Sequence, residues 1–222
     1  MKIKVLTHAS NQNEPGFQRW RQSMVHFKYD FTVLYDENFG WAKVYDTLYK
    51  WCISDEAKEY THILYTDSYD VVVVAGMSEV LEKYKDHTKA IFSTEKQCFP
   101  NIGQEKHFTD IQGEWKYINA GGSLFPIDVF IDFFVYCPMG TTNVQEWCIN
   151  NYGVNNQNGL LTLDSNCQIF QTIAFAYEKE LIQIEDRLLN TVTGSLPIFL
   201  HGNGRTDMTL PNNILNTILQ NK

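Results

Sequence analysis

Short apolar runs bounded by polar residues alternate with stretches of helical periodicity through the first half of the chain. The apolar runs predict strands at Lys2–Thr7, Phe31–Leu34, His62–Thr66, Val71–Ala75 and Ala90–Ser93. Apolar residues at helical spacing predict helices over Phe17–His26, over Gly40–Ile53 and after Ser78, which is expected to be an N-cap. Strands that alternate with helices are typical of an α/β fold.

The second half mixes short strands, helices and loops. Strands are expected at Ser123–Phe125, Gly159–Leu163 and Leu196–Leu200. A core-packing helix is expected within Phe125–Tyr136 and another helix within Thr141–Tyr152, whereas Cys98–Glu114 is expected to be an exposed loop. Because no internal repeat or linker interrupts the pattern, residues 1–222 are expected to form a single domain.

Composition narrows the class of protein. Hydrophobic residues make up 44% of the chain and charged residues 20%, as in an ordinary globular domain, and the net charge of -8 argues against a broad cationic surface for nucleic acid. The five cysteines are odd in number and lack C-x-x-C spacing, so we expect reduced core thiols. The N-terminus has no signal-peptide pattern and no apolar run could span a bilayer, which favours a cytoplasmic protein without membrane contact.

The most informative stretch is Thr61–Gly76, THILYTDSYDVVVVAG. Asp67 and Asp70 follow one predicted strand and precede another. Ligands of open α/β sheets bind outside the carboxyl ends of strands, and paired carboxylates there suit Mg²⁺ or Mn²⁺ shared with phosphates. The alternative is a turn in which the aspartates accept backbone hydrogen bonds.

Two further turns carry chemistry that could join this site. His201-Gly202-Asn203-Gly204 follows an apolar run, and an imidazole beside two aspartates favours Mn²⁺ over Ca²⁺. Asn119 precedes Gly121-Gly122, which would leave room for a ligand. The alternatives are a glycine turn with an incidental histidine and a tight turn between strands. No P-loop, dinucleotide-binding, serine-hydrolase or zinc motif is present.

Five ordered segments resemble the glycosyltransferase domain of procollagen lysyl hydroxylases. They are YTDSYDVVVVAG, IFSTEKQCFP, YINAGGSLF, LTLDSNCQIFQ and LPIFLHGNG, within Gly40–Gly204. The resemblance implies a GT-A fold, a Rossmann-like mixed sheet flanked by helices. It also implies a UDP-sugar donor such as UDP-glucose or UDP-galactose, a Mn²⁺ or Mg²⁺ cofactor, and transfer of a hexose with retention at the anomeric carbon.

The resemblance also implies roles for individual residues. The metal ligands would be Asp67, Asp70 and His201. The donor would be bound by Thr7, Lys43, Tyr69, Glu95, Gly202, Asn203 and Gly204. Catalysis and acceptor binding would involve Asn119, Gln145 and Asp164.

The chain departs from the family pattern at several positions. Where the family has an acidic pair, this chain has Asn143-Val144; Phe99 replaces a tryptophan, Ser165 a histidine and Asp207 a lysine. These changes leave open whether the acceptor is a hydroxylysine of a collagen-like chain, a glycan or a hydroxymethylated base of phage-type DNA, in a viral or microbial setting. The rival hypotheses are an inactive sugar-nucleotide-binding protein and a metal-dependent hydrolase of nucleotide sugars.

Overall fold

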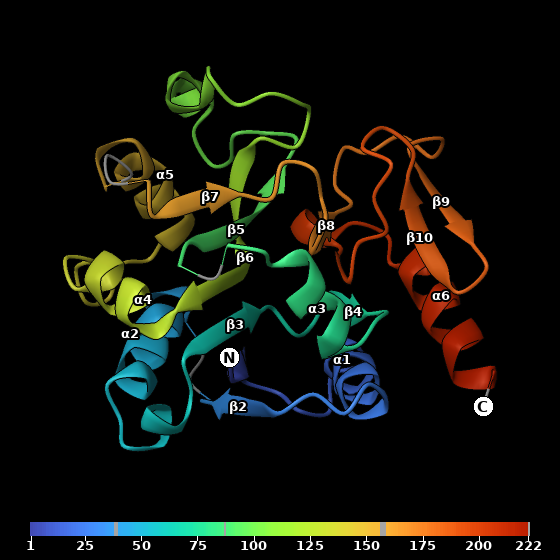
Figure 1. Ribbon diagram of the computed structural model, residues 1–222, viewed down its shortest axis with the longest axis horizontal. Helices are drawn as coiled ribbons and strands as arrows, with labels where there is room; N and C mark the ends of the chain where they lie inside the picture. The colour runs from blue at the N-terminus through green and yellow to red at the C-terminus, as the bar shows by residue number, and fades with distance from the viewer. Residues whose placement is uncertain (38–39, 87, 156–158, 222) are drawn as a thin grey trace.

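A central mixed sheet organises the protein (Figure 1). The computed structural model describes residues 1–37, 40–86, 88–155 and 159–221, and within them this sheet has six strands in the order β2-β1-β3-β6-β5-β7. Their bounds are β1 Ile3–Ala9, β2 Phe31–Tyr35, β3 His62–Thr66, β5 Ala90–Glu95, β6 Tyr117–Pro126 and β7 Leu161–Leu163. Strand β1 is parallel to β2 and β3, whereas β6 is antiparallel to β3 and β5. The predicted mixed α/β fold is therefore confirmed.

A smaller sheet brings distant segments together. Strand β11 (Phe199–His201) lies between β4 (Val71–Val73), to which it is antiparallel, and β8 (Phe170–Thr172), to which it is parallel. The hairpin of β9 (Leu181–Ile184) and β10 (Arg187–Asn190) and the last helix, α6 (Thr209–Gln220), lie at the right of Figure 1. The small sheet thus joins the turn after β3 to the end of β11.

Alternating side chains of the central strands enter two buried clusters. On β1 and β3, Leu6 and Ile63 enter one cluster, whereas Val5 and Leu64 enter the other. This period of two is expected of a sheet covered on both faces. Helices α2 (Trp41–Cys52), α4 (Ile127–Phe134) and α5 (Val144–Asn155) cover the first face, and α1 (Pro15–His26), α3 (Met77–Lys83) and the small sheet cover the second.

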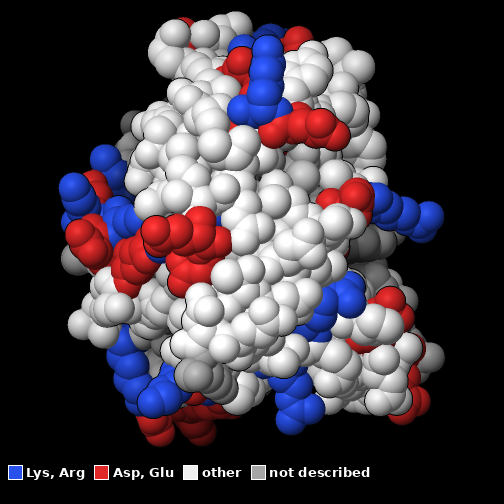
Figure 2. Space-filling view, turned by 90° about the vertical axis from the view of Figure 1, so that its right-hand side faces the viewer, with Lys and Arg blue, Asp and Glu red and all other residues white. Residues whose placement is uncertain are grey.

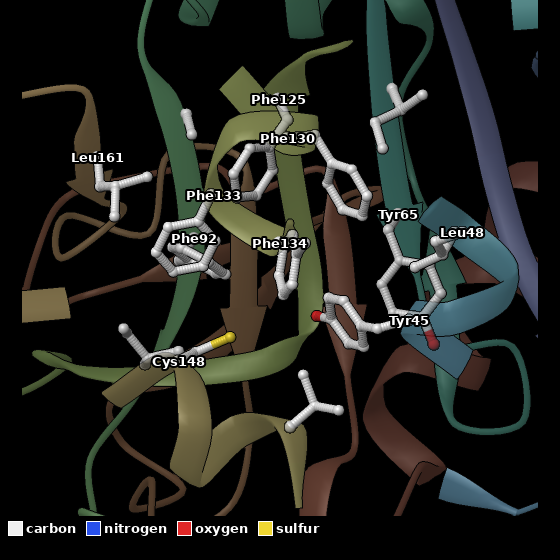
Figure 3. Packing of buried hydrophobic residues seen from close by; sticks show 14 of the residues in the cluster. Tyr45, Leu48, Tyr65, Phe92, Phe125, Phe130, Phe133, Phe134, Cys148 and Leu161 are labelled. Atoms are coloured by element: carbon white, nitrogen blue, oxygen red, sulfur yellow. The ribbon is translucent and has the colours of Figure 1, made fainter. Parts of the chain in front are cut away.

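Aromatic rings make up much of the first cluster (Figure 3). Phe125 packs edge-to-face on Phe130, and Tyr45 lies 4.6 Å from Phe134 between ring centroids. The hydroxyl of Tyr45 donates to the carbonyl of Ala120 at 3.1 Å. Aromatic packing therefore positions the backbone of β6 directly as well as stabilising the fold.

Three local predictions were wrong. Asn119–Gly122 forms no turn but lies inside β6, a strand that runs from Tyr117 to Pro126. The segment Cys98–Glu114 contains a short 3₁₀ helix, η2 (Ile102–Phe108), and buries Cys98 and Phe108, so it is not simply an exposed loop. Ser78 lies within α3, whose N-cap is Gly76.

The segment that lacks the family's acidic pair has a structural explanation. The Asn143 side-chain oxygen accepts from the backbone N–H of Glu146 at 3.1 Å, as an N-cap of α5 does. Val144 is buried in the first aromatic cluster. At these two positions the side chains therefore start the helix and fill the core, and neither supplies a carboxylate.

All five cysteines, each within the described part of the chain, are free. Among the described helices, none is long and apolar enough to cross a membrane. Figure 2 shows the face that carries β9, β10 and α6, on which acidic and basic side chains lie near one another around a broad uncharged area.

Candidate active site

Asp67, Asp70 and His201 converge at one edge of the two sheets. Asp67 follows β3, Asp70 precedes β4, and His201 is the last residue of β11, where it pairs with Val71. The His201 Nε2 lies 3.6 Å from Asp67 Oδ2 and 3.4 Å from Asp70 Oδ1. One ligand atom from each residue lies within 4.8 Å of the other two. The predicted convergence of two acids and one imidazole is therefore observed.

The electrostatics of these three residues suit a divalent cation. Burial raises the pKa of Asp67, and the Asp70 carboxylate raises it further, although His201 and a hydrogen bond from Tyr65 partly offset this. Burial lowers the pKa of His201, but the two carboxylates outweigh it and the net pKa is raised. Among the described residues, no lysine or arginine pairs with either aspartate, so a bound cation would relieve their repulsion.

Neighbouring groups fix the ligands in place. The Tyr65 hydroxyl donates to Asp67 Oδ1 at 2.8 Å, and the Asp67 N–H donates to the carbonyl of Gly121 at 2.9 Å. A Cβ on Gly121 would lie 2.3 Å from His201 Cε1 and 2.5 Å from Asp67 Oδ2. Gly121 therefore leaves between His201 and Asp67 the space that a Cβ would fill. Sequence reasoning missed Tyr65, although it stands two residues before Asp67 and alternate residues of an extended chain point to the same side.

A buried cluster of polar side chains adjoins the ligands. Glu95, the last residue of β5, accepts from Gln145 Nε2 at 2.6 Å and from Asn203 Nδ2 at 2.7 Å, and Asn119 also bonds to it. The Asn119 oxygen accepts from the Gly121 N–H at 3.1 Å. Four predicted site residues from β5, β6, α5 and the turn after β11 therefore meet in one place. We call these four residues the Glu95 cluster.

The Glu95 cluster makes stability depend on pH. Burial raises the pKa of Glu95 from 4.5 to about 7, although the three amides oppose the shift. The folded protein therefore holds a proton that the unfolded chain loses, and the free energy of unfolding should fall as pH rises from 4.5 to 7. The expected loss is about 3 kcal/mol at most. Denaturant titrations of wild type and Glu95→Gln across this range measure it; equal pH slopes would contradict the assignment.

The predicted donor residues occupy different environments. The Tyr69 hydroxyl accepts from the N–H groups of Ser10 and Asn11 at 2.7 and 2.8 Å, next to the carboxyl end of β1. Thr7 is buried and donates to the carbonyl of Thr66 at 2.7 Å, so it links β1 to β3. Lys43 is exposed on α2, and its ammonium pairs with an Asp36 oxygen at 3.1 Å.

Asp164 does not join the Glu95 cluster. Its two carboxylate oxygens accept from the backbone N–H groups of Gln168, Ile169 and Phe170, each at 2.8 Å. This pattern orders the turn that leads into β8 and leaves the carboxylate facing backbone donors.

The two glycines after His201 differ from each other. Gly202 is buried, and a Cβ there would lie 2.3 Å from Met208 Sδ. Gly204 is exposed with a φ of 67°, a conformation that glycine adopts readily. The two therefore allow the chain to turn tightly beside the ligands and the Asn203 side chain.

The mixed sheet flanked by helices has the fold of GT-A glycosyltransferases. The structure is similar to the crystal structure of a glycosyltransferase involved in the glycosylation of the major capsid of PBCV-1, with a TM-score of 0.55, 99% of this chain and 100% of that chain covered, and 12% identity. It is also similar to the galactosyltransferase LgtC in complex with donor and acceptor sugar analogs, with a TM-score of 0.50, coverage of 98% and 95%, and 9% identity.

Comparison of the sequence with family models identifies the family. The model of the PLOD GT domain matches residues 1–221, and the chain belongs to that family of glycosyltransferase domains. It is 29% identical over 237 residues to the procollagen-lysine,2-oxoglutarate 5-dioxygenase 1 of Gallus gallus, which covers 94% of this chain and 31% of that protein. It is 26% identical over 153 residues to a protein of Acanthamoeba polyphaga mimivirus, which covers 68% and 33%. The chain therefore spans about a third of the length of these relatives.

Proposed function

We propose that the chain transfers a hexose from UDP-glucose or UDP-galactose to a hydroxyl acceptor, with retention at the anomeric carbon. Mn²⁺, or Mg²⁺ in its place, would be held by Asp67, Asp70 and His201. The convergence of these three ligands within 4.8 Å carries the proposal. When bound, such a cation acts as a Lewis acid that offsets negative charge on a departing diphosphate.

Other residues of the chain would bind the donor and the acceptor. Tyr69 and Lys43, near the ends of β1 and β2, would bind the nucleotide side of the donor, and the backbone of Gly202–Gly204 would approach its phosphates. Amide and carboxylate groups hydrogen-bond well to sugar hydroxyls, so the Glu95 cluster would orient the hexose. Thr7 and Asp164 would act through the backbone that each one holds.

No acidic pair at positions 143 and 144 can activate the acceptor in this chain. Asn143 caps α5 and Val144 is buried, whereas Gln145 reaches Glu95. Gln145 and Asn119 would therefore help to position the attacking hydroxyl. Family membership favours a hydroxylysine of a collagen-like chain as the acceptor, and a glycan and a hydroxymethylated DNA base are the alternatives that an acceptor panel would distinguish.

A donor panel tests this function. With Mn²⁺ and UDP-glucose or UDP-galactose, the chain should release UDP, and EDTA should abolish the release because the cation offsets the charge of the leaving group. NMR of the product formed on an added acceptor should show the anomeric configuration of the donor.

Three outcomes would count against the proposal. Donor binding without UDP release would indicate an inactive sugar-nucleotide-binding protein. Free sugar as the sole product when an acceptor is present would indicate a hydrolase. An inverted product would refute retention.

A further inference from the structure

The loop of residues 173–180, between β8 and β9, carries two exposed aromatic side chains. Phe175 is 60% exposed and Tyr177 is 68% exposed, and neither belongs to a buried cluster of the described residues. Phe175 also has a φ of 63°, a region in which a bulky side chain is strained. Core packing therefore does not explain why a phenylalanine occupies this position, and strain of this kind is concentrated at functional sites.

One end of this loop is fixed to the active site. The N–H of Ile173 donates to the carbonyl of His201 at 3.0 Å, and the N–H of Ala174 donates to the side-chain oxygen of Asn203 at 3.0 Å. Since β11 lies between β4 and β8, Asp70 precedes the strand on one side of His201 and the loop follows the strand on the other. The loop therefore borders the metal ligands on the side away from Asp70.

The other end is held by a buried ion pair. Glu180 accepts from the Tyr177 N–H at 2.8 Å and pairs with the Lys96 ammonium at 2.6 Å. The same ammonium lies 5.4 Å from the centre of the Tyr177 ring. Lys96 directly follows Glu95 in the chain, so this end of the loop is held by the residue next to a member of the Glu95 cluster. Tyr177 and its neighbours Glu178 and Lys179 line a shallow, open patch of the surface.

We propose that Phe175 and Tyr177 form an aromatic platform on which a hexose ring of the acceptor stacks. The C–H face of a hexose is apolar and fits an aromatic face, while the charged groups of Glu178 and Lys179 bond to its hydroxyls. The inference rests on the proposed transfer, because that proposal assigns Tyr69 and Lys43 to the nucleotide. The side of His201 that the loop occupies would then remain available for the acceptor. The acceptor class that this platform selects is a carbohydrate.

Direct binding of a simple glycoside tests the platform. Saturation-transfer NMR with methyl β-galactoside and methyl β-glucoside should show contact with the wild type and a loss of contact in Phe175→Gly and Tyr177→Ala. Phe175→Gly should be at least as thermally stable as the wild type, since glycine adopts the observed φ without strain. Tyr136→Ala is the matched control, because Tyr136 is 80% exposed beyond the end of α4.

Kinetics separates this inference from the proposed function. With a glycoside acceptor, both loop variants should raise the acceptor KM by about 3- to 10-fold, the range for losing one aromatic contact. Equal glycoside binding by the wild type and both variants, or no glycoside binding by the wild type, would overturn the platform. Glycoside contact that depends on Phe175 in a protein that releases no UDP would instead overturn the transfer and leave the platform standing.

Discussion

Replacing Asp70 by alanine should lower Mn²⁺-dependent UDP release by at least about 100-fold, the scale on which single electrostatic contacts to a transition state are lost. Asp70 supplies one of three converging ligand atoms, and its Oδ1 lies 3.4 Å from His201 Nε2. The side chain is 33% exposed, so its removal should cost little stability. Initial rates and calorimetric Mn²⁺ titration of the same samples measure the effect.

A matched control removes a carboxylate elsewhere. Asp132 is exposed on α4, and Asp132→Ala should keep wild-type turnover and Mn²⁺ affinity. If Asp70→Ala turned over as fast as this control, the three residues would not be the metal site. Equal Mn²⁺ affinity in the two variants would lead to the same conclusion.

Gly121→Ala should test the spacing of the proposed metal ligands without removing any of the three side chains. The added Cβ would lie 2.3 Å from His201 Cε1 and 2.5 Å from Asp67 Oδ2, so the two ligands must move apart. We expect Mn²⁺ affinity to fall by about 10- to 100-fold, as for changes to groups that orient metal ligands. Overpacking should also cost about 1–3 kcal/mol of stability.

The control for this substitution is a glycine with space around it. A Cβ on Gly76 would come no closer than 4.0 Å to any neighbour, so Gly76→Ala should leave Mn²⁺ affinity unchanged. Mn²⁺ titration and thermal unfolding of both variants give the comparison. Wild-type affinity in Gly121→Ala would mean that the ligands do not need their observed spacing.

The convergence of Asp67, Asp70 and His201 could be predicted because these residues stand at the ends of apolar runs. Asp67, Asp70 and His201 each adjoin a strand that the sequence pattern indicates, and the family resemblance linked the early pair to the late histidine. The Glu95 cluster was predictable only as separate residues. Its contacts depend on how α5 packs against β5 and β6, which local pattern does not encode.

The errors have different causes. Gly121-Gly122 was interpreted as a turn because glycine is common there, but in this strand glycine allows close approach to the ligands. Helix α6 was missed although Leu210, Ile214, Leu215 and Ile218 recur at helical spacing. The hairpin β9–β10 was also missed. In β9 only Leu181 is buried, so the strand lacks the alternation of buried apolar and exposed polar residues that predicts a strand.

Two tyrosine rings of the aromatic cluster end at the catalytic edge. Tyr65 is buried and holds Asp67 through its hydroxyl, and Tyr45 is buried and holds the carbonyl next to Gly121. Variants selected only for heat tolerance could therefore retune turnover by repacking buried rings that support the site from behind. Drift in the interior of this chain would be an evolutionary route to altered activity that leaves every exposed group of the site intact.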